Sequence, residues 1–227
     1  MADKPVSLPD QLRIEIGEGM RTSALAYRAA DRSANATFVL AHGAGAGQQS
    51  AFITGFARGL ADRGVDVLTF NFLYTEQRRR VPDRTEKLEA CYRAAIATAR
   101  DHFDRRSVYI GGKSMGGRIA SMVADEAGVA GLVCLGYPFH PPGNPTRTRT
   151  KHLENLRTPA LIIQGTRDTF GRPDEVAKYK LSKEIRIVWI EAGDHSLKPP
   201  ARSGRTETQN IASAIEEAQG FIAKLKI

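Results

Sequence analysis

The sequence predicts an α/β protein with a mostly parallel, doubly wound sheet and an antiparallel edge at the N-terminal end. Two observations predict this fold. Short continuous apolar runs alternate with longer segments of helical periodicity, which is the order of strand–helix–strand crossovers in a parallel sheet. The first two predicted strands instead alternate apolar and polar residues, as strands with one exposed face do.

The predicted elements follow in chain order. The alternating pattern predicts two antiparallel strands, over residues 12–16 and 24–28. Continuous apolar runs predict strands buried on both faces, over residues 37–41, 65–70, 107–110, 131–135, 160–164 and 185–190. Helical periodicity predicts helices, over residues 51–62, 85–103, 114–126, 173–181 and 206–225. Since no stretch rich in Pro, Gly and Ser divides the chain, we expect one domain over residues 1–227.

The composition excludes several classes of protein. The 227 residues are 41% hydrophobic and 26% charged, which is ordinary for a globular protein but not for a disordered or fibrous one. No signal peptide is evident, and no apolar run approaches the ~20 residues that span a bilayer. Cys91 and Cys134 lie far apart in apolar stretches, so we expect buried free thiols and a cytoplasmic protein that binds no membrane.

A candidate nucleophile lies at the end of a predicted strand. Residues 112–116 read Gly-Lys-Ser-Met-Gly and match the G-x-S-x-G pattern of a nucleophile elbow, between an apolar strand and a helical segment. The small flanking residues let strand and helix approach while the Ser114 hydroxyl is presented to a base. A chance match is one alternative. A Walker A phosphate loop is another, but it requires glycine where the chain has Ser107.

The order of the chain selects the other two members of a triad. Hydrolases with this elbow carry Ser, then Asp or Glu, then His. Of the five histidines, His195 alone directly follows the last predicted strand, so it is the candidate base, with a solvated loop histidine as the alternative. Asp168 follows the preceding strand and would orient His195 and stabilise its imidazolium. Asp174 and Glu175 begin the next helix and are weaker candidates, and Asp194 is expected to shape the turn.

A glycine-rich loop over residues 42–47 follows the third predicted strand, where hydrolases place half of their oxyanion hole. The backbone N–H groups of Ala44 and Met115 are the expected donors to a developing oxyanion. Gly45 substitutes for Ala44 if the loop is shifted by one residue. A dinucleotide-binding fingerprint fails in both registers, because it requires glycine at Gln48 or at Ser50.

Four motifs now agree in order, at residues 42–45, 112–117, 165–168 and 193–196. Together they resemble an α/β-hydrolase, and more narrowly the small lidless family related to dienelactone hydrolases, which also includes a domain of a eukaryotic chromatin-complex subunit. The resemblance extends to residues 71–72 and 135–143. It implies an α/β-hydrolase fold without a cap domain and a hydrolytic triad. Dienelactone hydrolases carry a cysteine at the position of Ser114, so the resemblance does not imply their substrate.

Only residues 136–159 separate two core strands where many α/β-hydrolases insert a cap, so we expect an open cleft. The expected substrates are short-acyl carboxylic esters or thioesters, cleaved through Ser114, Asp168 and His195. No histidine or cysteine spacing is typical of metal ligands, and we expect neither metal nor cofactor. The alternative is a catalytically silent scaffold or interaction module that associates with nucleic acid, although no nucleic-acid-binding motif supports it.

The chain carries 33 Lys and Arg against 25 Asp and Glu, a formal net charge of +8. Such an excess has three interpretations: binding of nucleic acid, binding of an anionic substrate, or solubility alone. Basic residues concentrate after predicted strand ends, over residues 76–84, 147–157 and 196–206. Ligands bind at that edge of such sheets, so Arg78, Arg79 and Arg80 are candidates for a rim that attracts an anionic small-molecule ester. Solvated arginines are the alternative. His140 is a further rim candidate, or the partner in a structural hydrogen bond.

Overall fold

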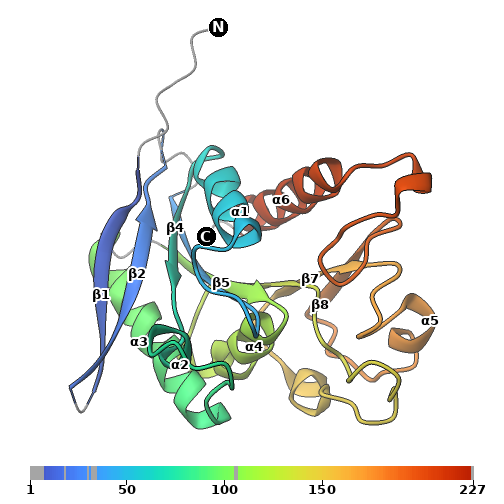
Figure 1. The fold of residues 1–227 in the computed structure, drawn as a ribbon, viewed down its shortest axis with the longest axis horizontal. Coiled ribbons are helices and arrows are strands. Elements are labelled where there is room, and N and C mark those ends of the chain that lie inside the picture. Colours follow the sequence, from blue (N-terminus) through green and yellow to red (C-terminus); the bar gives the residue numbers. More distant parts are fainter. Residues whose placement is uncertain (1–7, 18, 30, 32–34, 105–106, 226–227) are drawn as a thin grey trace, which may run out of the picture.

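The computed structural model describes residues 8–17, 19–29, 31, 35–104 and 107–225. Its centre is an eight-stranded sheet in the order β1-β2-β4-β3-β5-β6-β7-β8 (Figure 1). The strands are β1 (Asp10–Gly17), β2 (Met20–Tyr27), β3 (Ala36–Ala41), β4 (Val65–Phe70), β5 (Ser107–Lys113), β6 (Gly131–Leu135), β7 (Ala160–Gly165) and β8 (Ile185–Ile190). Strands β3 to β8 are parallel, whereas β2 is antiparallel to β1 and β4. The predicted fold class is therefore confirmed.

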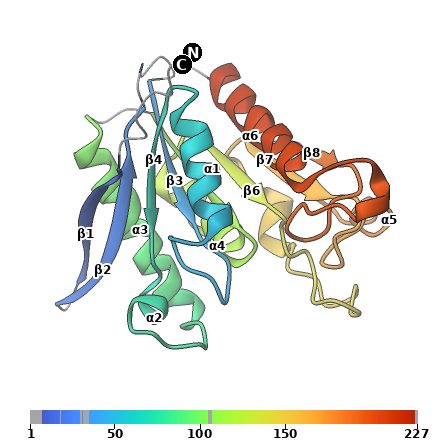
Figure 2. The same ribbon diagram turned by 45° about the horizontal axis from the view of Figure 1, so that its top comes forward.

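Helices cover both faces of the sheet (Figures 1 and 2). Helices α1 (Ala51–Ala61) and α6 (Glu207–Lys224) pack on one face, and α3 (Thr85–His102) and α4 (Met115–Ala127) on the other. Successive strand residues point to opposite faces, so Val39 belongs to the apolar cluster under α3 and α4 while Phe38 belongs to the cluster under α1 and α6. This two-sided burial is why the parallel strands are continuous apolar runs.

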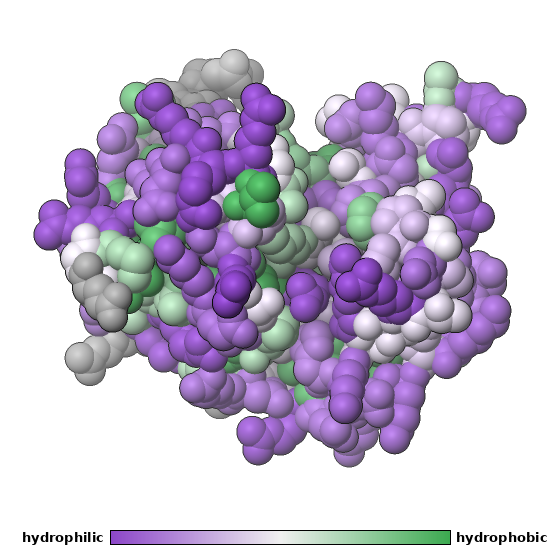
Figure 3. All heavy atoms as spheres, turned by 60° about the horizontal axis from the view of Figure 1, so that its bottom comes forward, coloured by the Kyte–Doolittle hydropathy of each residue, from purple (hydrophilic) through white to green (hydrophobic). Residues whose placement is uncertain are grey.

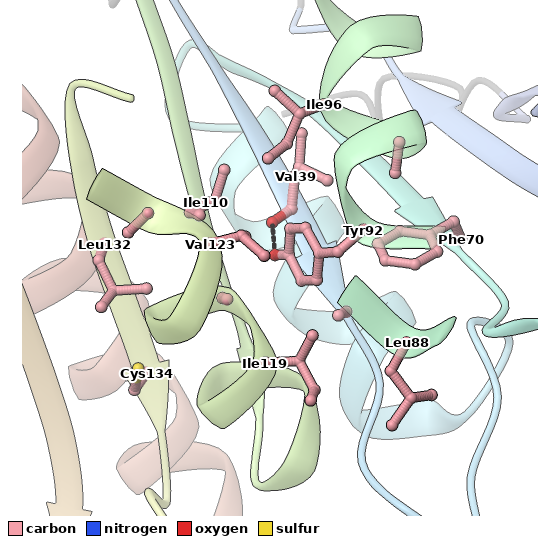
Figure 4. Packing of buried hydrophobic residues seen from close by; sticks show 14 of the residues in the cluster. Val39, Phe70, Leu88, Tyr92, Ile96, Ile110, Ile119, Val123, Leu132 and Cys134 are labelled. Carbon is pink, nitrogen blue, oxygen red and sulfur yellow. Dashed lines mark hydrogen bonds between the residues drawn. The ribbon is translucent and has the colours of Figure 1, made fainter. Parts of the chain in front are cut away.

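Tyr92 of α3 joins the two central strands of the sheet (Figure 4). Its hydroxyl donates to the carbonyl oxygen of Val39 in β3 at 2.9 Å and accepts from the N–H of Gly111 in β5 at 2.9 Å. Burial raises the pKa of Tyr92 well above its usual value, so the hydroxyl keeps its proton. The bonds fix the two strands whose carboxyl ends lead to Ser114 and to the glycine-rich loop.

The structure differs from the expected elements mainly in short segments. Three short helices have no predicted counterpart, because about one turn shows no hydrophobic period: α2 (Leu73–Glu76), η1 (Lys151–Asn155) and η2 (Ala201–Ser203). The helix expected over residues 173–181 is wrong in length, since α5 spans Pro173–Val176 and the chain continues in turns bonded three residues back. Strand β5 runs past the predicted residue 110 to Lys113 and leads directly into Ser114.

No cap domain interrupts the fold. Residues 136–159, between β6 and β7, form an irregular loop that contains only the short helix η1 among its described elements. Cys91 and Cys134 are buried free thiols, as expected. Among the described residues, no helix has the length and apolar character needed to cross a membrane.

Candidate active site

Ser114 occupies a sharp turn between β5 and α4. Its φ of 51° and ψ of −114° lie in a region that residues with a Cβ rarely adopt. The turn presses the helix against the neighbouring strand. A Cβ on Gly112 would lie 2.5 Å from the carbonyl oxygen of Ala41, and one on Gly116 would lie 2.6 Å from the same atom. Glycine is therefore required on both sides of the serine, which is the physical content of the G-x-S-x-G pattern.

The structure brings Ser114, Asp168 and His195 together from three separate loops. Nε2 of His195 lies 2.8 Å from Oγ of Ser114, and Nδ1 lies 2.8 Å from Oδ2 of Asp168. Because a carboxylate only accepts, Nδ1–H is the donor, and Nε2 is left free to accept the serine proton. The arrangement has the geometry that activates a serine hydroxyl as a nucleophile.

Two residues that the sequence does not single out hold this arrangement in place. Gln164 Nε2 donates to Oδ2 of Asp168 at 2.8 Å, and the Phe170 N–H donates to Oδ1 at 2.8 Å, so the fully buried carboxylate is hydrogen-bonded on both oxygens. The Phe170 ring also stacks on the imidazole of His195, with ring centroids 4.2 Å apart. Their only signal in the sequence is their place in the strand and turn that carry Asp168.

The glycine-rich loop after β3 lies directly against the serine. A Cβ on Gly43 would be 3.5 Å from Cβ of Ser114. Within the described ranges, the backbone N–H groups of Ala44 and Met115 donate to no other group. Met115 begins α4, where the N–H groups lack helical partners and the helix dipole is positive. Both groups are available to an oxyanion, and Gly45, at φ 74° in the same turn, remains the alternative to Ala44.

His42 fixes the position of this loop. The side chain is fully buried, its Nδ1–H donates to the carbonyl oxygen of Gly43 at 2.8 Å, and its Nε2 accepts from the N–H of Phe72 at 3.1 Å. Burial lowers the pKa of His42 below the ordinary value for imidazole, which favours the neutral ring that these two bonds require. The imidazole thus connects the loop after β3 to the chain that follows β4.

A cavity of about 330 Å³ opens beside Ser114. Its wall comes from the glycine-rich loop, the start of α1, the end of β5 with the turn that follows it, the loop after β8 and the start of α6: Gly43, Ala44, Ala46, Ser50, Phe52, Ile53, Lys113, Ser114, His195, Ser196 and Glu207. Figure 3 looks toward the carboxyl ends of the parallel strands and shows a hollow near the centre with apolar residues in its walls. A larger hollow of about 420 Å³ lies against β1 and β2, but no triad residue lines it. The cavity at Ser114 is the candidate substrate site.

The rim candidates lie outside this cavity wall. His140 is buried, its Nδ1–H donates to the carbonyl oxygen of Pro141 at 2.8 Å, and its Nε2 lies 3.2 Å from Oε2 of Glu175. Both ring nitrogens are engaged, which favours the structural alternative for His140.

The three arginines of the rim hypothesis, Arg78, Arg79 and Arg80, are exposed between α2 and α3. Nη2 of Arg79 lies 2.6 Å from Oδ1 of Asp83. None of the three lines the cavity, so any effect on a substrate is a long-range electrostatic one. In the part of the chain that the structure describes, no three His, Cys, Asp or Glu side chains are grouped to hold a metal ion.

Comparisons with known proteins identify the family and the fold. A family model described as an alpha/beta hydrolase domain matches residues 34–223. An α/β serine hydrolase homologue from Coxiella burnetii has 17% identity and a TM-score of 0.73, with 97% of this chain and 99% of that chain covered. An α/β serine hydrolase without lid from Xanthomonas campestris has 16% identity and a TM-score of 0.72, with 96% and 94% covered.

A dienelactone hydrolase from Anabaena variabilis has 19% identity and a TM-score of 0.70, with 95% of this chain and 97% of that chain covered. These structures share the fold, and one of them is described as lacking a lid. Since the family model spans most of the sequence, including both the elbow and the glycine-rich loop, the chain belongs to the α/β-hydrolase domain family.

Proposed function

We propose that this α/β-hydrolase is a serine esterase that cleaves short-acyl carboxylic esters or thioesters through an acyl-enzyme. The observation that carries the proposal is the continuous hydrogen-bond chain from Asp168 through His195 to Ser114, with both links at 2.8 Å. It ends at a strained serine on the wall of a cavity, which is where a nucleophile has to be presented.

Acylation begins when Oγ of Ser114 attacks the carbonyl carbon and Nε2 of His195 takes the hydroxyl proton. Asp168 stabilises the imidazolium that forms. The carbonyl oxygen becomes negative in the tetrahedral intermediate, and the N–H groups of Ala44 and Met115 donate to it, an effect of ~2.7–4 kcal/mol for one donor. The carbon–oxygen or carbon–sulfur bond then breaks, and His195 gives its proton to the departing alcohol or thiol.

Deacylation repeats these steps with water as the nucleophile. His195 takes a proton from the water as the oxygen attacks the ester carbon on Ser114. Collapse of the second tetrahedral intermediate releases the acid and returns the proton to Oγ. No group beyond the triad and the two N–H donors is needed for either half of the cycle.

The preference for short acyl groups rests on the open surroundings of the serine. A long acyl chain needs an apolar enclosure, which α/β-hydrolases commonly build from a cap, and residues 136–159 contribute only a loop and η1. The cavity of about 330 Å³ is at the small end of ligand sites. We therefore expect turnover to fall as the acyl chain is lengthened beyond a few carbons. A cytoplasmic location stays a prediction, with which the two buried thiols are compatible.

Ser114→Ala tests the proposal. Hydrolysis of p-nitrophenyl acetate should fall by about 10³-fold or more, because the nucleophile is removed while the oxyanion donors stay. Ser50→Ala is a matched control, since Ser50 lines the same cavity but its side chain does not cap α1. The control should keep its turnover within about threefold, an effect below 1 kcal/mol. Equal turnover by Ser114→Ala and the unaltered chain would refute the assignment.

Labelling with a fluorophosphonate provides a readout that does not depend on guessing a substrate. The reagent phosphonylates an activated serine, so the unaltered chain and Ser50→Ala should label and Ser114→Ala should not. A folded chain that fails to label, and that binds DNA in a salt-dependent manner, would instead support the scaffold alternative.

A further inference from the structure

The residue directly before the proposed nucleophile carries a buried ammonium that has no hydrogen bond or ion pair with the described residues. Lys113 ends β5 and is only 9% exposed. Its side chain forms no hydrogen bond and no ion pair with any residue in the described ranges, whereas the surface cations Arg21, Arg28 and Arg93 are each paired with a carboxylate. Burying a charge without a partner costs free energy. The free-energy cost of burying this charge requires an explanation, because Lys113 is adjacent to the proposed nucleophile, Ser114.

The surroundings of Lys113 place its ammonium at the candidate substrate site. Nζ lies 5.9 Å from the ring centroid of Phe52, at the outer limit for a cation–π contact. A Cβ on Gly136 would lie 3.2 Å from Nζ and 3.4 Å from Nδ1 of His195, so the ammonium and the imidazole flank the same backbone atom. Lys113 and Phe52 both line the cavity beside Ser114.

The ammonium also has access to that cavity. Among the described residues, Nζ of Lys113 is not one of the polar side-chain atoms that are fully enclosed and lack a hydrogen bond. Since Nζ has no hydrogen-bond partner among the described residues, it must contact open space, and the cavity is the open space that Lys113 lines. A ligand in the cavity can therefore contact the ammonium and accept a hydrogen bond from it.

The acidic groups near Lys113 are committed to other donors. Oδ2 of Asp168 accepts from Gln164 and His195, and Oδ1 of Asp194 accepts from the N–H groups of Ser196 and Lys198. Both carboxylates favour the charged form of Lys113, but burial is the larger effect and lowers the pKa of Lys113 to about 8. The ammonium is still mostly charged at neutral pH.

Glu207, the one acidic residue among the described residues that line the cavity, is about half exposed, with Oε2 3.9 Å from Nζ of Lys198. Glu207 therefore lies at the mouth of the cavity, and the charge of Lys198 offsets its charge. The wall thus combines one buried cation with the apolar side chains of Phe52 and Ile53. A small anion with a short apolar stem fits that combination.

We propose that the cavity beside Ser114 binds the acyl part of half-esters of short dicarboxylic acids, with the Lys113 ammonium donating to their free carboxylate. This inference rests on the proposed esterase function and names its substrate class. A monoanionic carboxylate matches a single ammonium. A phosphate dianion would place two charges against one cation with Asp168, Asp194 and Glu207 nearby, so it fits less well.

Two methyl esters of equal acyl length test the proposal. Monomethyl glutarate carries the second carboxylate, and methyl pentanoate replaces it with a methyl group. We expect kcat/KM, measured by methanol release, to be higher for monomethyl glutarate by about tenfold or more, as one charge-assisted hydrogen bond gives. Lys113→Met removes the charge but keeps an unbranched stem, and it should abolish this preference, measured as the ratio of kcat/KM for the two esters in the same variant.

Lys198→Met is the matched control. It removes one positive charge at the mouth of the same cavity, where Lys198 lies near Glu207, and it should keep the preference for monomethyl glutarate within about twofold. Loss of the preference in both variants would indicate a general electrostatic field and overturn the assignment to Lys113. An unaltered chain that cleaves methyl pentanoate at least as fast as monomethyl glutarate would overturn the half-ester class.

A ligand-protection experiment tests the proposal on the unaltered chain, in case Lys113→Met does not fold. The monoamide of glutaric acid, which carries one carboxylate, should slow fluorophosphonate labelling of the unaltered chain more than the neutral pentanamide does, and this advantage should fade as the pH rises through about 8, where Lys113 loses its proton. Equal protection by the two amides would refute the inference. Such a result would leave the esterase proposal intact, because labelling itself reports the activated Ser114, whereas a chain that never labels would refute both.

Discussion

Two loops meet at Ser114, and they use their histidines in opposite ways. In the loop after β3, His42 is fully buried, and both of its ring nitrogens bond to backbone groups. In the loop after β8, the side chain of His195 is 23% exposed, and its Nε2 faces Oγ of Ser114. An imidazole transfers protons only when one nitrogen faces the reactant. Only His195 has the geometry of a base, although both rings lie next to the site.

In the proposed mechanism, each loop presents a different kind of group to the substrate. The loop after β3 presents backbone N–H groups, which act well only when the backbone does not move, and His42 holds that backbone. The loop after β8 presents a side chain, which Asp168 and the Phe170 ring orient from behind. Substitutions at the two histidines should therefore separate catalysis from stability.

Substitution of the base should have the larger effect. In His195→Gln the ring that accepts the serine proton is lost, so kcat/KM for methyl pentanoate should fall by about 10⁴-fold or more. The melting temperature should change little, because the imidazole is partly exposed at a cavity wall. Steady-state kinetics and a thermal melt measure the two effects. A loss of less than about tenfold in kcat/KM would remove His195 from the role of base.

Substitution of the buried histidine should show the reverse pattern. His42→Ala removes the acceptor of the Phe72 N–H and leaves a cavity, so the free energy of unfolding should fall by about 2–4 kcal/mol. The activity of the folded fraction should fall far less than in His195→Gln, because no proton passes through His42. Urea denaturation and kinetics on the same preparation test this. A fully stable but inactive His42→Ala protein would contradict the separation of roles.

The pH dependence of stability gives an independent check on His42. Burial lowers the pKa of His42 in the folded chain, so below the ordinary value of about 6.5 the unfolded chain binds a proton that the folded chain does not. The free energy of unfolding should therefore decrease as the pH falls below about 6.5. His42→Ala should make this decrease shallower without removing it, because burial also lowers the pKa of His152, to about 4.

Much of the fold and the geometry of the triad could be predicted from the sequence, because both are set by local patterns and chain order. Buried parallel strands are continuous apolar runs, and loops at their carboxyl ends meet at one edge of the sheet. The Ser–Asp–His order then selected Ser114, Asp168 and His195, which the structure brings within hydrogen-bond distance. Their catalytic roles stay predictions until the variants are measured.

The supporting residues could not be predicted, because their roles depend on contacts between distant segments. Phe170 stacks on His195, and Tyr92 bonds to β3 and β5, yet each reads in the sequence as an ordinary aromatic residue. Lys113 looked like part of a Walker A pattern, and only the structure reveals that its charge is buried. The helix α5 ends at Val176, and the next residues form turns with hydrogen bonds three residues back. The local sequence carries no signal for this change.

The smallest expected effect concerns the exposed arginines after α2, which lie outside the cavity where the two loops meet. Arg78 and Arg80 do not line the cavity, so they can act only through their field, which 0.15 M salt screens beyond ~8 Å. If that field attracts anionic esters, raising the salt from 20 to 200 mM should lower kcat/KM for monomethyl glutarate by about two- to threefold and leave methyl pentanoate unchanged. The double substitution Arg78→Gln with Arg80→Gln should flatten this dependence without changing the preference that we assign to Lys113. If kcat/KM for the two esters depends on salt in the same way, these arginines are only solvated. The charge of the substrate is then distinguished only by groups inside the cavity.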